Sequence, residues 1–266
     1  MMRMTFLGQC GFVLDTGETV VVIDPYLSDY LDKNCCTEEV RWKRRFPAGT
    51  DLRSINPDVV LLSHRHWDHL DPWTIKPYID SGGNALFVGP FATAERLAQQ
   101  GVRNTRYIDA GEELPINDVC ITAIACAHPE LHTDGDGHTM ELSYVISWEG
   151  GTLFFGGDMM VRPGLAETVA SHHCGVMLLP CNGRDAWRDA HGIIGNATSK
   201  EAARFARDAG AGILIPMHHD LYEINACEEE VIRRDAMEAG ICAFCMRPMQ
   251  TVAWDDLIDG RAFGAR

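Results

Sequence analysis

The sequence predicts an α/β fold in which two β-sheets pack face to face and helices cover their outer sides. Two observations carry this prediction. Short apolar segments rich in β-branched residues recur along the chain, and segments with helical spacing follow them in each half. The chain shows no internal repeat and no linker segment, so we expect a single domain that spans residues 1–266.

The first part of the chain alternates apolar strands with turn-type sequences. We expect strands at 3–8, 10–15, 19–24, 58–63 and 85–89, and helices at 72–79 and 91–100. Pro72 suits an early helical position, and Gly101 suits the end of a helix. Residues 28–56 are polar and lack periodicity, which predicts a long loop with short helical pieces. Such a loop is either a functional lid or a solvated surface excursion.

The second part repeats this alternation. We expect strands at 119–126, 142–148, 152–156, 176–180, 212–216 and near 251–254, with a polar loop at 128–139. Thr198 is a good N-cap for a helix that ends at Gly210, and its first turn carries an acidic residue. A second amphipathic helix covers 227–239, and Gly240 closes it.

Composition limits the classes of protein. At 266 residues and 46% hydrophobic content, the chain can bury a sizeable core. No apolar run approaches the roughly 20 residues of a membrane-spanning helix, and the start lacks the regions of a secretory signal. The net charge of −15 disfavours a nucleic-acid partner. We therefore expect a cytoplasmic protein with a small-molecule substrate and no membrane partner, and homo-oligomerisation stays open.

The ten cysteines do not resemble a disulfide framework in a chain of this length. Cys10 and Cys126 are among those that lie in or beside apolar runs, where a free thiol behaves as a small hydrophobe. Cys242 and Cys245 have CxxC spacing, but no second CxxC completes a zinc ribbon. We expect this pair to pack in the core near a C-terminal strand.

A dense cluster of ligand-type residues follows the strand expected at 58–63. His64, His66, Asp68 and His69 have the spacing HxHxDH. Adjacent cationic imidazoles would repel one another unless a metal ion or neutral tautomers relieved them. The alternative, a set of surface histidines, explains the density of the cluster poorly. The cluster therefore indicates a metal site at one edge of a sheet.

Three later strands also end in residues that bind metals, and these residues are His128, Asp158 and His218. His132 and His138 compete with His128 because they lie in the same loop. Asp158 follows two glycines that would let the backbone pass close to a metal, although it would also suit the cap of a turn. Three strand ends of this kind, added to the first cluster, predict one shared site.

His218 and His219 are adjacent, so one of the two must point elsewhere if the backbone there is extended. We assign His218 to the metal and expect His219 to contact substrate or a metal ligand. Asp220 is free to orient an imidazole. Asp24 either supports a metal ligand or closes a turn. The remaining histidines outside the 128–139 loop are expected at helix ends or in loops, and they are His172, His173 and His191.

Together these motifs resemble the metallo-β-lactamase superfamily, from the N-terminal strands to about residue 235. Within it, the stretches Ala197-Thr198-Ser199 and Ile215-Pro216-Met217-His218-His219-Asp220 are similar to the L-ascorbate-6-phosphate lactonase-like subgroup. The resemblance implies a four-layer αββα sandwich with two metal positions at one edge. It implies that the first metal is held by His64, His66 and His128. It implies that the second is held by Asp68, His69 and His218, with Asp158 as the bridge.

The expected function is that of a metal-dependent hydrolase. Imidazole and carboxylate ligands suit zinc, manganese or iron, and we expect one or two divalent ions per chain, Zn²⁺ or Mn²⁺. Two ions would lower the pKa of a shared water from ~15.7 toward ~7, and the resulting hydroxide would attack the substrate. The expected substrate is a lactone or ester of a phosphorylated, acidic or sugar metabolite. Asp68 and His219 are the candidate catalytic groups.

Three alternatives remain open. A phosphodiesterase or nuclease would use the same ligands, although the acidic balance and the lack of a basic arm count against it. A di-iron redox protein would be expected to carry a carboxylate where His66 stands and to have a flavin-binding domain. A metal-binding protein without turnover would keep the ligand set and have no substrate.

Overall fold

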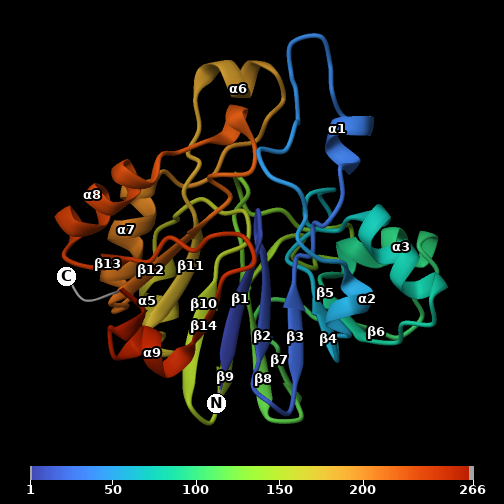
Figure 1. Cartoon of the computed structure of the whole chain (residues 1–266), viewed down its shortest axis with the longest axis horizontal. Coiled ribbons are helices and arrows are strands. Elements are labelled where there is room, and N and C mark those ends of the chain that lie inside the picture. The colour runs from blue at the N-terminus through green and yellow to red at the C-terminus, as the bar shows by residue number, and fades with distance from the viewer. Residues whose placement is uncertain (1, 264–266) are drawn as a thin grey trace.

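The computed structural model describes residues 2–263, and it shows two mixed β-sheets packed face to face with helices on their outer faces (Figure 1). This arrangement confirms the predicted four-layer αββα sandwich. Both sheets are built in the same way. One half of each sheet is antiparallel and the other half is parallel, although the sequence itself shows no repeat.

The first sheet comes from the N-terminal part of the chain and one late strand. Its strands, in spatial order, are β14 (Thr251–Ala253), β1 (Arg3–Gly8), β2 (Gly11–Asp15), β3 (Val20–Ile23), β4 (Val59–Leu61), β5 (Leu86–Gly89) and β6 (Thr105–Tyr107). The strands from β3 to β6 are parallel, and helices α3 (Pro72–Asp80) and α4 (Ala94–Gln99) connect them. These helices bury Ile75, Tyr78 and Leu97 against the outer face of the sheet.

The second sheet follows in the chain. Its strands, in spatial order, are β13 (Cys242–Ala243), β12 (Ile213–Met217), β11 (Val176–Pro180), β10 (Gly151–Phe155), β9 (Leu142–Trp148), β8 (Val119–Ala125) and β7 (Glu113–Ile116). Helices α5 (Leu165–Ala170), α7 (Ser199–Asp208) and α8 (Glu229–Ala239) cover its outer face. Every residue of β11 and β12 is buried because the other sheet covers one face and helices cover the other.

The main core lies between the sheets. Phe12 and Leu61 from the first sheet meet Tyr144, Phe155 and Leu178 from the second, and all five are at most 1% exposed. Burial of each such side chain is worth about 1.5–3 kcal/mol. This packing fixes the two sheets relative to each other, and it therefore fixes the positions of the loops at their ends.

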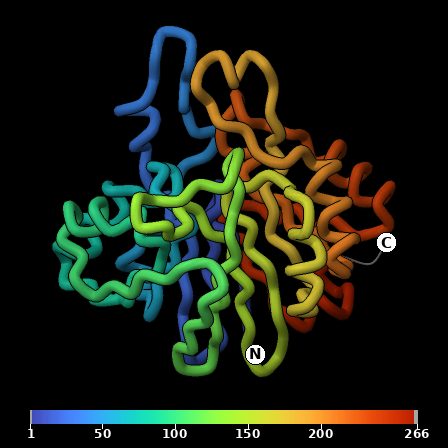
Figure 2. Tube along the Cα trace, turned by 180° about the vertical axis from the view of Figure 1, so that it is seen from behind, coloured from blue at the N-terminus to red at the C-terminus, as the bar shows by residue number. Residues whose placement is uncertain are grey.

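Two excursions rise at one end of the sandwich (Figures 1 and 2). The first, residues 28–56, is a long loop with the short helices α1 (Tyr30–Asn34) and α2 (Leu52–Ile55), as the sequence predicts. The second, residues 181–198 between β11 and α7, carries α6 (Ala186–Ala190). The Tyr222 hydroxyl donates a hydrogen bond to the Tyr26 hydroxyl at 2.6 Å, and this contact anchors the base of the first excursion.

Several elements differ from the sequence prediction. The structure adds β6, β7, β13, α5 and α6, and β7 has the half-exposed pattern of an edge strand with little hydrophobic signal. The last strand stops at Ala253 because α9 (Trp254–Ile258) begins directly after it. All ten cysteines are free. Core packing is wrong for Cys242, which is exposed at the end of the sheet, whereas Cys245 is half-buried.

No helix within residues 2–263 combines the length and the apolar character that crossing a membrane requires.

Candidate metal centre

The structure brings the predicted ligands together from four separate segments. The loop after β4 contributes four of them, and the loops after β8, β10 and β12 contribute one each. Both sheets are therefore needed to form the group. The ligands are His64, His66, Asp68, His69, His128, Asp158 and His218.

The first group contains three imidazoles. One ring nitrogen of each of His64, His66 and His128 lies within 4.8 Å of the others, and His64 Nε2 is 3.0 Å from His66 Nδ1. Burial and the neighbouring imidazoles hold the pKa of His64 well below its usual range. Burial also lowers the pKa of His66, and it lowers the pKa of His128 to about 4. Three neutral imidazoles with free lone pairs can therefore face one point at neutral pH.

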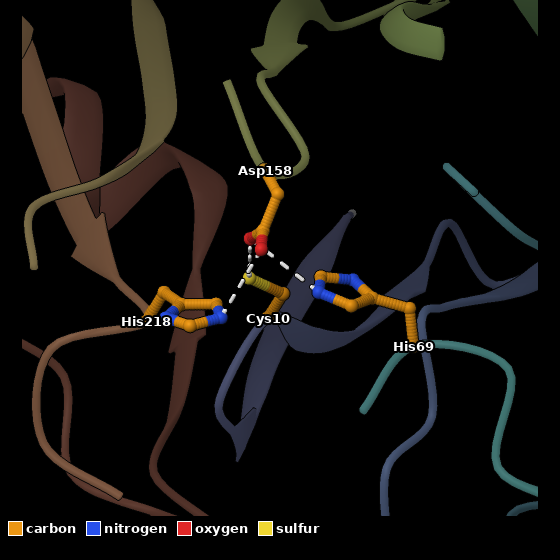
Figure 3. A group of neighbouring side chains, drawn as sticks. All are labelled: Cys10, His69, Asp158 and His218. Carbon is orange, nitrogen blue, oxygen red and sulfur yellow. Dashed lines mark hydrogen bonds and ion pairs between the residues drawn. The ribbon is translucent and has the colours of Figure 1, made fainter. Parts of the chain in front are cut away.

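The second group combines imidazoles with carboxylates, and Figure 3 shows three of its members, His69, Asp158 and His218. His69 Nε2 lies 3.4 Å from Asp158 Oδ1, and His218 Nε2 lies 3.3 Å from Asp158 Oδ2. Asp68 Oδ2 lies 3.2 Å from His218 Nε2. Burial acts to lower the pKa of His218, but the carboxylates of Asp158 and Asp68 outweigh it and raise the pKa to about 9.

Asp158 connects the two groups. Its Oδ2 is 3.7 Å from His128 Nε2 in the first group, while both oxygens face histidines of the second group. Burial acts to raise its pKa, yet His218 and His69 hold the pKa well below the usual range. A carboxylate in this position can serve two metal ions at once.

Asp24 orients His69 through the ring nitrogen that faces away from the other ligands. Its Oδ2 accepts a hydrogen bond from His69 Nδ1 at 2.7 Å, which leaves His69 Nε2 to face the other ligands. Ser63 donates to the same carboxylate from its backbone N at 2.8 Å and from its hydroxyl at 2.5 Å. Carboxylates that orient metal-binding histidines in this way are a usual part of metal sites. Asp24 also follows β3 directly, in a bend of the chain.

The donor set fits a divalent metal ion. His69 is fully buried, and its Nε2 makes no hydrogen bond although it points among carboxylates. An unpaired buried polar atom costs roughly 1–3 kcal/mol, which a bound ion would recover. Imidazole and carboxylate are the ligands of zinc and related metals.

The sequence did not reveal the role of Gln9. Its Nε2 donates a hydrogen bond to Asp68 Oδ2 at 2.8 Å and lies 2.9 Å from His218 Nε2. Its backbone oxygen accepts from the backbone N of His218 at 2.8 Å. Gln9, Asp24 and His218 all have positive φ, of 55°, 40° and 57°. Backbone strain of this kind costs about 1–3 kcal/mol per residue and is often kept at functional sites.

A comparison with known proteins identifies the family. The model of the family described as "Beta-lactamase superfamily domain" matches residues 3–218. The chain belongs to the metallo-β-lactamase superfamily.

The chain also resembles a curated relative in sequence and two solved structures in fold. A UPF0173 metal-dependent hydrolase of Methanopyrus kandleri is 27% identical over 244 residues, which cover 90% of this chain and 94% of that protein. Igni18, a metallo hydrolase of Ignicoccus hospitalis, has a similar structure with a TM-score of 0.67 at 19% identity, covering 94% and 97% of the chains. The structure of an isothiocyanate hydrolase from Delia radicum gut bacteria is also similar, with a TM-score of 0.73 at 16% sequence identity. The match covers 95% of this chain and 99% of that chain. The chain is thus a metal-dependent hydrolase of this superfamily, and the lactonase-like subgroup does not follow from these matches.

The other histidines of this chain lie apart from the group of proposed ligands. His132 pairs with Glu141 at 3.3 Å on the surface, and His138 stacks on Phe91 with ring centroids 4.0 Å apart. Among the three histidines of the 128–139 loop, His128 is the one that the structure brings to the other ligands. His172, His173 and His191 lie in turns or at a helix end, as the sequence predicts.

His219 also lies away from the ligand group. Its Nδ1 is 3.1 Å from the carbonyl oxygen of Cys227, and its ring lines a neighbouring cavity with Arg45 and Glu229. The left-handed backbone at His218 turns the two adjacent side chains apart. The structure therefore gives His219 no contact with the proposed ligands, and we correct its expected catalytic position on this ground.

Gly157 allows the strand-end loops of the two sheets to touch. It has φ of 63°, and a Cβ at this position would lie 3.0 Å from Ser63 Cβ. The sequence predicts that this glycine lets the backbone approach a metal. The structure instead shows an approach to the residue that precedes the HxHxDH motif.

A cavity of about 240 Å³ opens directly beside the ligand group. Five of the proposed ligands line it, namely His66, Asp68, His128, Asp158 and His218. Its walls come mainly from the two excursions and from the HxHxDH loop, and they consist of Leu31, Cys35, Trp42, Trp67, Gly192, Ile193, Ile194 and Asn225. The cavity can therefore hold a small molecule against the ligands.

Proposed function

We propose that this metal-dependent hydrolase cleaves an ester or lactone of a small molecule whose groups next to the scissile bond are uncharged and largely apolar. The observation that carries the proposal is the cavity beside the ligand group. Leu31, Trp42, Trp67, Ile193 and Ile194 make its walls apolar. Pockets of this kind bind through apolar surface and use a few polar groups to orient the ligand.

The proposed metal positions follow the two ligand groups. His64, His66 and His128 would hold one ion, and His69, Asp68 and His218 would hold the other, with Asp158 between them. When bound, divalent ions supply Lewis acidity, which lowers the pKa of water from ~15.7 toward ~7 and polarises the electrophile. No serine or cysteine nucleophile is then required.

The protein's own residues position the water and move its proton. The side chain of Asp68 is 16% exposed and faces the cavity, whereas that of Asp158 is 5% exposed. Burial acts to raise the pKa of Asp68, but His69 and His218 keep it below the usual range, so the carboxylate is ionised at neutral pH. The hydrogen bond from Gln9 Nε2 holds Asp68 Oδ2 in place. Asp68 is therefore the proposed proton acceptor.

A phosphorylated substrate has little support in the cavity. Among the described residues that line it, none is lysine or arginine. Two arginines nearby are engaged elsewhere. Arg44 Nη1 donates to the carbonyl oxygen of Ser28 at 3.0 Å, and the Arg96 guanidinium lies 3.3 Å from the ring centre of Trp67. A phosphate would lack the charged partners that usually bind it. We therefore favour the uncharged form of the expected lactone or ester.

A panel of matched substrates tests this proposal. Metal-loaded protein would be assayed with alkyl and aryl esters, lactones, their phosphorylated counterparts and phosphodiesters. Isothiocyanates join the panel because one protein of this fold is an isothiocyanate hydrolase. We expect the highest kcat/KM for an uncharged ester or lactone. Hydrolysis confined to phosphodiesters would contradict the proposal and favour the phosphodiesterase alternative, and hydrolysis confined to isothiocyanates would contradict the ester assignment.

A further inference from the structure

The loop between β1 and β2 enters the interior of the ligand group. Gly8 pairs with Gly11 across this hairpin, so Gln9 and Cys10 form its tip. Hairpin loops usually lie on the surface, since buried backbone is difficult to satisfy. Both tip residues are nevertheless completely buried. The loop is thus placed where its side chains can act on the site.

The thiol of Cys10 lies among the proposed ligands of the second group (Figure 3). Its Sγ and the ligand atoms of His69, Asp158 and His218 all lie within 4.8 Å of one another. Sγ is 3.8 Å from Asp158 Oδ1. A zinc ion binds sulfur at about 2.3 Å and a carboxylate oxygen at about 2.0 Å, which places two such ligands about 3.5 Å apart in a tetrahedral site. The observed separation is close to this value.

A second observation points to a ligand at the same place. His69 is fully buried, and its Nε2 has no hydrogen-bond partner although Nδ1 is fixed by Asp24. The unpaired nitrogen faces Asp158 within the same set of four atoms. Two imidazoles, one carboxylate and one thiol are a donor set that zinc commonly accepts.

We propose that Cys10 is a further, thiolate ligand of the second metal ion, next to His69, Asp158 and His218 of the set given above. This inference rests on the metal positions given under the proposed function. Binding breaks the S–H bond, forms a metal–sulfur bond and releases the proton to solvent. A sulfur ligand favours zinc over manganese, which prefers oxygen donors. The chain therefore selects zinc at this position.

Cys126 provides a matched comparison. It is a buried thiol close to Asp158, but its Sγ lies 3.0 Å from the backbone oxygen of Asp158 and 3.6 Å from that of Gly156. Its hydrogen bonds are therefore satisfied by backbone, and it is not in the group of four ligand atoms. Cys35 is a second control because it lines the cavity.

Cobalt substitution tests the proposal without measuring activity. Metal-free protein would be titrated with Co²⁺, and thiolate coordination gives an intense near-ultraviolet sulfur-to-cobalt charge-transfer band. We expect this band in the unmodified protein, in Cys126→Ser and in Cys35→Ser, and its loss in Cys10→Ser. Zinc affinity should fall at least ~10–100-fold in Cys10→Ser, the range seen when groups beside metal ligands are removed. Circular dichroism would check that each variant is folded.

X-ray absorption at the zinc edge covers the case in which Cys10→Ser does not fold. Zinc-loaded unmodified protein should show a sulfur neighbour at about 2.3 Å. Two results would overturn the role of Cys10 and leave the proposed metal positions standing. One is stoichiometric cobalt binding without the charge-transfer band, and the other is a band that persists in Cys10→Ser. A protein that binds neither metal would overturn the proposed metal positions as well.

Discussion

His128 and His218 are both buried imidazoles, yet their surroundings move their pKa values in opposite directions. Burial lowers the pKa of His128 to about 4, and Asp158 compensates only in part. For His218 the effect of burial is outweighed by Asp158 and Asp68, and the pKa rises to about 9. In the metal-free protein at neutral pH, His128 is therefore neutral and His218 carries a proton.

This difference predicts a pH dependence of metal binding. A metal ligand must be a neutral imidazole, so binding at the second position displaces the proton of His218. Metal affinity there should rise at least tenfold per pH unit between pH 7 and about 9, since the proposed Cys10 ligand also loses its proton on binding. Chelator competition across this range, with calorimetry in buffers of different ionisation enthalpy, measures both affinity and released protons. An affinity independent of pH would contradict the assignment of His218.

Asp24 gives a second prediction at the scale of one residue. The substitution Asp24→Asn removes the charge that accepts from His69 Nδ1 and from Ser63. We expect metal affinity to fall about 10–100-fold, because groups that orient metal ligands contribute on this scale. Asp58→Asn is the matched control, since Asp58 accepts from the backbone N of Val20 at the far end of β4. Equal losses in both variants would show that Asp24 acts only as a structural turn residue.

The two excursions supply most of the apolar residues that line the cavity beside the proposed ligands. Residues 28–56 supply Leu31 and Trp42, and the segment after α6 supplies Ile193 and Ile194. A capping box at Thr198 and Glu201 starts α7 directly after the second excursion, and Arg184 pairs with Glu201 at 2.7 Å. A capped helix therefore follows the loop of the second excursion, and loops of this kind can vary in sequence and determine specificity.

Ile194 allows the role of this excursion to be tested. It is 43% exposed and lines the cavity, so its side chain adds little to the core. We expect Ile194→Ala to raise KM for an apolar ester about tenfold while the free energy of unfolding changes by less than about 0.5 kcal/mol. Met237→Ala, which changes a more exposed side chain on α8, is the control and should leave KM unchanged. An unchanged KM for Ile194→Ala would separate this excursion from substrate binding.

The sequence predicts those elements whose local pattern is strong. The strands before His64, Asp158 and His218 are apolar runs that end in polar residues, so both the strands and the convergence of their ends could be predicted. Gln9 and Cys10 could not be connected to the site in this way. Their position depends on the packing of one hairpin against the other sheet, and such contacts between distant segments leave no periodic signal.

His219 shows a further limit of local reasoning. Its neighbour His218 has a left-handed backbone, which an extended strand would not predict. The backbone N of His218 donates a hydrogen bond to the backbone oxygen of Gln9, a residue far away in the sequence. This hydrogen bond occurs together with the left-handed backbone at His218. The direction of a side chain at a strand end is therefore decided by tertiary contacts.

At the scale of the whole molecule, the proposed metal centre joins the two sheets. The HxHxDH loop leaves the first sheet, whereas His128, Asp158 and His218 leave the second. A ligand that binds only the folded state stabilises it by about 2.7 kcal/mol when its concentration is 100 times Kd. We expect removal of metal to lower Tm and its return to restore it, as measured by calorimetry with and without chelator. An equal Tm in both states would contradict a centre that bridges the sheets.

Anomalous diffraction from crystals of the zinc-loaded protein tests the central claim most directly. We expect two anomalous peaks at the zinc edge. One should lie among His64, His66 and His128, and the other among His69, Asp158 and His218. Peaks elsewhere on the molecule, or none among these residues at saturating zinc, would contradict it.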